Sequence, residues 1–421
     1  MNFYIKALFI AIPLFGFLII IEELIAKFLG KNINRSFDVI SSLSSGITNT
    51  IRDSLKFGVV IISYPWLLEK LVLYKLEPAW IVVFIAFIIK DFSGYWMHRL
   101  NHRVNILWNR HIIHHSSEDF NLSCALRQSI SNTFRFSAIF MIPAAILGIP
   151  AYYFAIIGPI QLFMQFWYHT TLISNLGWLE KIIVTPSHHR VHHAINKEYI
   201  DKNYGQIFII WDKIFGTFQS ELEDVKPIYG TLQPVNTWNP IIINFQHLWQ
   251  IAKDSWNTNS YIDKLLIWFK PTGWRPNDIK NRYPINKLSN VYKQIKYDTE
   301  KSSVLVYWSW FQLSISIIFM FNLFLNIQKL SYLMVIIYAC FIFIHIFSYT
   351  SILDGKSYVV YIEILKYFFG INFFLSSNLF SQSIQIFSNS ILVFYLTISM
   401  ILTLYFVVNK QRHLKLIFEI K

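Results

Sequence analysis

Long apolar stretches alternate with short polar ones along most of this 421-residue chain. A run of roughly 17 to 25 apolar residues is long enough for a helix to cross a bilayer. The pattern predicts about nine such helices, at Phe3–Ile21, Ile47–Leu68, Pro78–Trp96, Thr133–Gly148, Pro150–Thr171, Val304–Leu325, Ser331–Ser351, Tyr358–Leu379 and Ile384–Val408. We therefore expect an all-α integral membrane protein.

A long polar segment, from Leu172 to Ser303, separates the fifth predicted helix from the sixth. It is rich in tryptophan and proline and has no low-complexity run. The predicted helices and this segment divide the chain into four parts, which are N-terminal transmembrane helices, a catalytic region, a segment in the cytosol or at the membrane interface, and C-terminal transmembrane helices. Their expected bounds are 1–90, 91–240, 241–303 and 304–421.

Charge gives the predicted helices an orientation. Basic residues near the ends of membrane helices are retained in the cytosol, and the segment His98–Arg135 holds five arginines against two acidic residues. The loops at the opposite ends of the helices are nearly free of net charge. We therefore expect the N-terminus outside, and the C-terminus and the long polar segment in the cytosol.

Composition excludes several classes of protein. The net charge of +13 could suggest nucleic-acid binding, but with 54% apolar and 14% charged residues the basic side chains fit membrane edges better. The chain has two cysteines, Cys124 and Cys340, which do not form a CxxC pair. A disulfide framework and a zinc ribbon are therefore both excluded.

Ten of the thirteen histidines are concentrated between His98 and His193. They form three motifs, HRLNH, HIIHH and HHRVHH, together with one histidine in QFWYHTT. Spacings of three and four residues place imidazoles on one face of a helix, where they can converge on one ion. We expect metal ligands at His98, His102, His111, His114, His115, His169, His189, His192 and His193, with His188 left open because the third motif is complete without it.

Two observations favour a centre with two metals. Eight to ten imidazoles exceed what one ion of four to six ligands can use. Adjacent histidines such as His114 and His115 diverge by about 100° on a helix, so each could serve a different ion. Imidazole alone does not name the metal. Asp91, Asp201 and Asp212 lack the histidine spacing, and we expect them to orient ligand rings.

The three motifs resemble those of the fatty acid hydroxylase and sterol desaturase superfamily, whose members carry HxxxH and HxxHH boxes at a cytosolic di-iron site. Longer strings, at Asn105–Ser129, Gln165–Thr170 and Asn175–Phe218, resemble the alkylglycerol monooxygenases within it. The resemblance implies an oxygen-dependent di-iron monooxygenase with two iron ions and tetrahydrobiopterin as cofactors. Such an enzyme hydroxylates the ether α-carbon of alkylglycerols or lyso-ether lipids and releases a fatty aldehyde.

One position departs from the family pattern. A glutamate commonly follows the first box, whereas here His102 is followed by Arg103. A cation beside the site would disfavour a metal unless its side chain points outward. Another electron donor, such as a partner protein, and a sterol, carotenoid or fatty acyl substrate therefore remain alternatives.

A metal transporter is a more remote interpretation, because the histidine boxes lie at the ends of the predicted helices and not within them. The pterin-binding residues are not identified by any motif. For the membrane itself, the charge pattern fits the endoplasmic reticulum of a eukaryote and the inner membrane of a bacterium equally.

Overall fold

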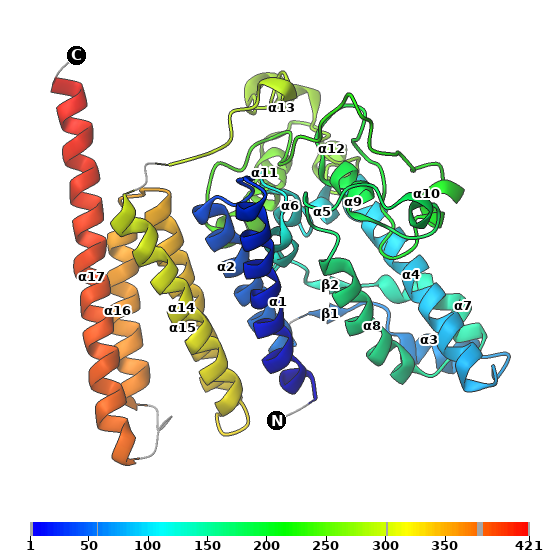
Figure 1. Ribbon diagram of the computed structural model, residues 1–421, viewed down its shortest axis with the longest axis horizontal. Coiled ribbons are helices and arrows are strands. Elements are labelled where there is room, and N and C mark those ends of the chain that lie inside the picture. The colour runs from blue at the N-terminus through cyan, green and yellow to red at the C-terminus, as the bar shows by residue number, and fades with distance from the viewer. Residues whose placement is uncertain (1–2, 57, 300–301, 377–381, 420–421) are drawn as a thin grey trace.

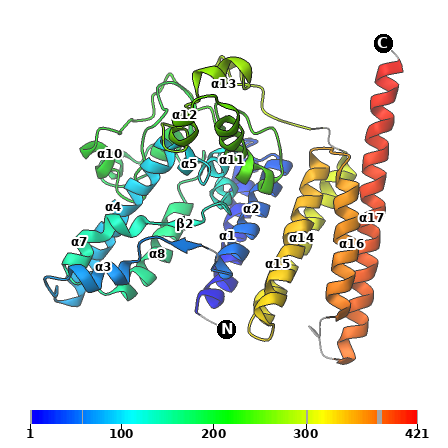
Figure 2. The same ribbon diagram turned by 180° about the vertical axis from the view of Figure 1, so that it is seen from behind.

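The computed structural model describes residues 3–419 except residue 57 and the segments 300–301 and 377–381. Six helices in this part of the chain are long and apolar enough to cross a membrane. They are roughly aligned in Figures 1 and 2. The N-terminus lies at one end of these helices and the C-terminus at the other. The expectation of a mainly helical, multi-pass membrane protein is confirmed.

The N-terminal half combines two of the long helices with shorter elements. Helix α4 carries the first histidine motif at its C-terminal end, and α8 ends just before His169. The elements of this half are α1 (Phe3–Phe28), α2 (Ser36–Ser54), β1 (Val59–Val60), α3 (Tyr64–Leu71), α4 (Ala79–Arg103), α5 (Asn105–Trp108), α6 (Ile112–His115), the 3₁₀ helix η1 (Leu122–Leu126), β2 (Phe134–Arg135), η2 (Ser137–Met141), α7 (Ile142–Ile146) and α8 (Ala151–Phe166).

The polar segment after α8 forms short helices joined by long loops, and it covers the upper end of the N-terminal half (Figure 1). The third histidine motif forms α9, which begins at Pro186, a residue well suited to the first turn of a helix. The elements are η3 (Gly177–Lys181), α9 (Pro186–His193), α10 (Ile210–Ile214), α11 (Pro240–Asn257), α12 (Tyr261–Leu266), α13 (Asn277–Arg282) and η4 (Val291–Lys293).

The C-terminal part is a bundle of four helices that lies beside α1 and α2 (Figures 1 and 2). The helices are α14 (Ser303–Asn326), α15 (Tyr332–Leu353), α16 (Val359–Ser376) and α17 (Gln382–Glu419). They correspond to the last four predicted membrane helices. The end of the predicted Tyr358–Leu379 helix, residues 377–379, lies outside the described residues.

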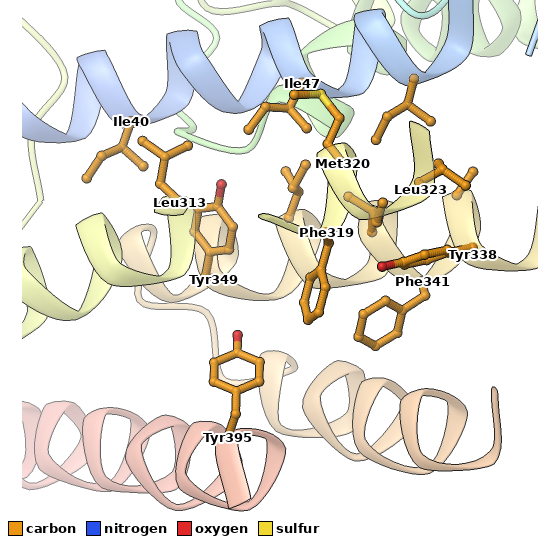
Figure 3. Packing of buried hydrophobic residues seen from close by; sticks show 14 of the residues in the cluster. Ile40, Ile47, Leu313, Phe319, Met320, Leu323, Tyr338, Phe341, Tyr349 and Tyr395 are labelled. Atoms are coloured by element: carbon orange, nitrogen blue, oxygen red, sulfur yellow. The ribbon is translucent and has the colours of Figure 1, made fainter. Parts of the chain in front are cut away.

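The main apolar core joins this bundle to α2. Ile40 and Ile47 of α2 face Leu313, Met320 and Leu323 of α14, as Figure 3 shows, and all five side chains belong to one buried cluster. Within a bilayer, close packing of such side chains holds helices together, because the surrounding lipid is as apolar as they are. Helix α2 is therefore held between the C-terminal bundle and the histidine-bearing half.

A chain of polar side chains crosses the interior of the bundle. Glu363 and Lys366 of α16 form a buried ion pair of 2.6 Å. The Lys366 ammonium also donates to the Ser399 hydroxyl of α17 at 2.8 Å, and that hydroxyl accepts from the Gln312 amide of α14 at 2.9 Å. The charges that interrupt the eighth predicted helix are thus paired inside the protein.

Three of the predicted membrane helices differ from the structure. Ile47–Leu68 is not one helix, because α2 ends at Ser54 and α3 starts anew at Tyr64–Pro65, with the short parallel pair β1–β2 between. Thr133–Gly148 holds β2, η2 and α7, and α7 ends at Ile146, shortly before Gly148, whose φ of 66° is left-handed. Within Pro150–Thr171 the helix α8 has 16 residues.

The reason for the first difference is local chemistry. Buried Arg52 and its neighbour Asp53 pair with each other, and the Arg52 guanidinium also donates to the Asn132 carbonyl, so the end of α2 is tied to the segment before β2. Ser63 then caps a new helix with Pro65 in its first turn. The apolar run is real, but it is not one continuous helix. We expected about nine membrane helices. In the described part of the chain, six helices are long and apolar enough to cross a membrane.

Candidate metal centre

The predicted ligands come from four separate parts of the chain that meet at one end of the long helices. His98 and His102 lie in the last turns of α4. The second motif lies in and beside α6, the third forms α9, and His169 follows the end of α8. The rings therefore gather near the C-terminal ends of α4 and α8, where membrane-spanning and polar segments meet.

The structure brings all nine predicted histidines together in two groups. Within each group every residue offers one nitrogen, and these nitrogens lie within 4.8 Å of one another. We call these sets the first and second histidine groups. The first group consists of His98, His102, His111, His115 and His192; the second consists of His114, His169, His189 and His193.

Neighbouring histidines are divided between the two groups, as the helical geometry predicts. His114 belongs to the second group and His115 to the first, and their ring planes are 89° apart. The pair His192 and His193 is divided in the same way, with planes 85° apart. Residues four apart, such as His189 and His193, stay in one group. The HxxHH spacing thus supplies ligands to both groups at once.

The ring nitrogens are spaced as ligands of a common ion would be. In the first group, the Nε2 of His111 lies 2.9 Å from that of His98 and 3.2 Å from that of His115. In the second group, the Nε2 of His189 lies 2.9 Å from that of His169 and 3.0 Å from that of His193. Two nitrogens each about 2.1 Å from an ion, at right angles, would be about 3 Å apart.

Backbone carbonyls fix the tautomer of four of these rings. The Nδ1 atoms of His98, His114, His169 and His192 lie 2.8 to 3.2 Å from carbonyl oxygens of Tyr204, Arg127, Gln165 and Lys202. A carbonyl only accepts, so each Nδ1 must be the donor. A neutral imidazole has one N–H, and the Nε2 of each of these rings therefore presents a lone pair.

These tautomers leave a contact that only a cation explains well. The Nε2 atoms of His114 and His169 are 3.3 Å apart, and both are lone-pair acceptors by the argument above. Two facing lone pairs repel, whereas a positive ion between them satisfies both. In addition, the buried Nε2 of His102 has no hydrogen-bond partner in the structure. The residues present therefore fit a pair of metal ions.

Burial keeps the rings outside the membrane helix neutral. Desolvation lowers the pKa of His114 to about 3, and it lowers the pKa of His111, His115, His169, His189, His192 and His193 well below the ordinary value. Nearby histidines lower these values further. Only a neutral imidazole can ligate a metal, so the site is prepared for binding.

Aromatic side chains surround both groups, and the sequence did not single them out. Trp108 lies against His102 and His115, with ring centroids 5.1 and 5.5 Å apart. Tyr168 and Phe120 cover the second group. In the sequence, the position of Trp108 between the first two motifs could have indicated its place at the site. Aromatic residues are frequent throughout this chain, however, so that position did not stand out. These rings pack directly against histidine rings of both groups.

Of the three aspartates expected to orient ligand rings, Asp212 acts on one ring indirectly, through the backbone at Tyr204. Among the described hydrogen bonds, none of the three carboxylates contacts a histidine ring. Asp91 accepts from the backbone N–H groups of Ile207 and Phe208 and from the Trp211 indole. Asp212 accepts from the N–H groups of Tyr204 and Gly205 at 2.7 Å, and so supports the loop whose carbonyl orients His98. Asp201 pairs with Arg103.

Two further residues lie apart from the groups. His188 belongs to neither, and its Nδ1 lies 3.4 Å from the Thr185 hydroxyl while its Nε2 is 3.8 Å from a Glu180 carboxylate oxygen. Arg103 forms a 2.7 Å ion pair with Asp201, and its side chain is 55% exposed. The cation next to the first motif thus points outward, away from the histidine nitrogens.

The comparisons with known proteins agree with this geometry. The fatty acid hydroxylase family model matches residues 83–217, which contain all nine grouped histidines. A human alkylglycerol monooxygenase is 37% identical over 359 residues, covering 85% of this chain and 80% of the human protein. The chain belongs to the alkylglycerol monooxygenase family. It is therefore an oxygen-dependent monooxygenase, an oxidoreductase of the fatty acid hydroxylase and sterol desaturase group.

Other relatives show how far the likeness extends. The alkylglycerol monooxygenase of Xenopus tropicalis is 42% identical over 263 residues, which cover 62% of this chain and 58% of that protein. An ornithine lipid hydroxylase of Rhizobium tropici is 33% identical over 138 residues, covering 33% and 42%. No solved structure matches the chain significantly. The likeness to family members thus spans most of the chain.

Proposed function

We propose that this protein is a membrane di-iron monooxygenase that hydroxylates the ether α-carbon of alkylglycerols or lyso-ether lipids. The observation that carries the proposal is the pair of histidine groups with converging ring nitrogens, which include the facing, unprotonated Nε2 atoms of His114 and His169. Membership in the alkylglycerol monooxygenase family supports the substrate class. The ligand residues are the nine grouped histidines, and His188 is not among them.

The metal is proposed to be iron because splitting dioxygen needs a redox-active ion, and imidazole ligands suit iron. Iron held by both groups would supply the activation of oxygen. The protein residues fix the geometry: the carbonyls of Tyr204 and Arg127 hold the N–H tautomers of His98 and His114. The surrounding aromatic rings exclude water, so that oxygen activation is directed at the lipid.

The proposed reaction consumes one molecule of O₂ and two electrons. One oxygen atom of O₂ enters the C–H bond next to the ether oxygen, and the other leaves as water after taking two electrons and two protons. The hydroxylated carbon is a hemiacetal, which breaks its C–O bond to give a fatty aldehyde and glycerol or its derivative. Tetrahydrobiopterin is proposed as the donor of the two electrons.

The location of the site suits a lipid substrate. His98 and His102 lie at the end of α4, which is long and apolar enough to cross a membrane, and several side chains on this helix expose apolar surface. A lipid could therefore reach the centre from the bilayer without leaving it. We propose that this end faces the cytosol, in the endoplasmic reticulum or in a bacterial inner membrane.

The test is a reconstituted reaction. Purified protein loaded with ferrous iron should release fatty aldehyde from an alkylglycerol when oxygen and tetrahydrobiopterin are present. Omitting oxygen or the pterin should abolish release. Protein that holds two irons per chain and forms no aldehyde would contradict the proposed substrate or reductant.

A second candidate keeps the iron chemistry and changes the partners. Arg103 stands where the family commonly has a glutamate, which favours testing a cytochrome or ferredoxin as electron donor and a sterol, carotenoid or fatty acyl chain as substrate. Lipid profiles of a deletion strain would separate the two, because only the first candidate predicts accumulation of ether lipids. A metal transporter would instead predict uptake of iron into vesicles without oxygen consumption.

A further inference from the structure

A buried ion pair links α2 to the second histidine motif. Asp38 of α2 and Arg127 lie 2.8 Å apart, and each side chain is 2% exposed. The sequence separates them by 89 positions, and neither belongs to a histidine box. Taking two charges out of water costs several kcal/mol each. Such a pair needs further contacts to be stable.

The Arg127 guanidinium makes those contacts on both sides. Its Nε donates to the Ser42 hydroxyl of α2 at 2.9 Å, and its Nη1 donates to the Ser116 hydroxyl at 2.8 Å. Ser116 directly follows His115, the last residue of the second motif. The planar guanidinium therefore fixes the distance between α2 and the histidine motif.

The backbone of the same arginine reaches a ligand ring. The Nδ1–H of His114 donates to the Arg127 carbonyl, with 3.2 Å between the atoms. This bond determines the tautomer of His114 and aims its Nε2 into the second histidine group. The carbonyl can do this only while residue 127 stays in place, and its side chain is anchored by Asp38.

Asp38 is itself held by a second donor. The Ser117 hydroxyl donates to its other carboxylate oxygen at 2.6 Å, and the Arg35 guanidinium lies 3.8 Å away. The carboxylate is thus fixed from the loop after the second motif as well as from Arg127. No other described carboxylate occupies this position against Arg127.

We propose that Asp38 is a positioning residue for the second histidine group, acting through Arg127 on His114. The inference rests on the proposed function, because it assumes that the groups hold metal. It assigns α2 a role beyond packing: the helix between the C-terminal bundle and the catalytic half also sets the ligand geometry. Residues that orient metal ligands typically contribute 10–100-fold in metal affinity.

The test compares Asp38→Asn with Asp53→Asn in purified full-length protein. Both residues lie on α2, but Asp53 pairs with Arg52 at the far end of the helix and is 34% exposed. Iron-free protein is titrated with ferrous iron, and bound iron is counted after gel filtration. We expect two irons in the wild type and in Asp53→Asn. In Asp38→Asn one iron should bind about 10–100-fold more weakly, and the other within about threefold of its normal affinity.

A second substitution identifies the weakened site. Adding His193→Ala, in the second group, to Asp38→Asn should remove no more iron at a concentration that fills only the stronger site. Adding His192→Ala, in the first group, should remove the remaining iron. A merely structural role for Asp38 predicts instead that both irons weaken together with the unfolding temperature.

The outcomes separate the inference from the function. Wild-type protein that binds fewer than two irons contradicts the proposed function. A wild type with two irons and an Asp38→Asn variant with unchanged affinities overturns the inference alone. If Asp38→Asn does not fold, Arg127→Lys is measured in its place. Lysine keeps the positive charge but cannot bond to Ser42, Ser116 and Asp38 at the same time. Two irons of normal affinity, or equal loss of both, in folded Arg127→Lys would overturn the inference.

Discussion

His192 and His193 are adjacent in the chain, yet their rings face different histidine groups, with planes 85° apart. The Nε2 of His192 lies 3.1 Å from that of His115, and the Nε2 of His193 lies 3.0 Å from that of His189. One turn of α9 thus contributes to both groups. This relationship allows each proposed metal to be removed separately.

We expect His192→Ala and His193→Ala each to lower the iron content of purified protein from about two to about one per chain. Each substitution removes one ligand from one group and leaves the other group complete. Turnover should be lost in both variants, because the proposed reaction needs both ions. Elemental analysis together with oxygen uptake measures the two effects.

His188→Ala is the matched control, since His188 lies on the same helix outside both groups. It should keep two irons, although the loss of its contact with Thr185 should lower the unfolding temperature slightly. Loss of iron from this variant equal to that of His193→Ala would show that the division into two groups is wrong.

The site was more predictable from the sequence than the fold was. Spacing indicated eight of the nine grouped histidines, because the 100° step of a helix places neighbours such as His114 and His115 on different sides, whereas His169 stands alone in the sequence. The orienting groups could not be found this way, since a carbonyl such as that of Tyr204 belongs to every residue type. Likewise, hydropathy cannot show that the apolar run at residues 47–68 is divided. There the hydrogen bond from Arg52 to the distant Asn132 carbonyl ties down the end of α2.

Asp212→Asn should weaken the first histidine group. Its carboxylate accepts from two backbone N–H groups and from the Thr217 hydroxyl, and so holds the turn that carries the Tyr204 carbonyl. An asparagine oxygen replaces only part of these bonds, and a lost bond to a buried charge costs about 1.5–3 kcal/mol. Thermal unfolding and the binding of iron by the first group measure this effect.

The second histidine group serves as the internal control for this variant. The second histidine group has no contact with Asp212, so in Asp212→Asn its iron should bind as in the wild type. The pattern should therefore be the reverse of that expected for Asp38→Asn. Weakening of the second group alone by Asp212→Asn would contradict this assignment.

Arg103→Ala should leave the metal content unchanged. Its side chain points outward to Asp201, and an exposed ion pair contributes about 0.2–1 kcal/mol. We expect two irons and a small decrease in unfolding temperature, measured by elemental analysis and thermal unfolding. A change in the KM for the reductant, with iron content constant, would place the electron donor near Arg103. Loss of iron would instead contradict the outward orientation.

Lys366→Met should destabilise the C-terminal bundle by about 3–5 kcal/mol, because it leaves the Glu363 charge buried without its partner. Both side chains are at most 2% exposed, and the Ser399 hydroxyl would lose one of its two donors as well. The double variant Lys366→Met with Glu363→Gln removes both charges and should recover most of the lost stability, since a buried ion pair can be replaced by neutral groups at little cost. Thermal unfolding in detergent compares the three proteins. A single variant as stable as the wild type, or a double variant no more stable than the single one, would show that the pair is not buried in the folded protein.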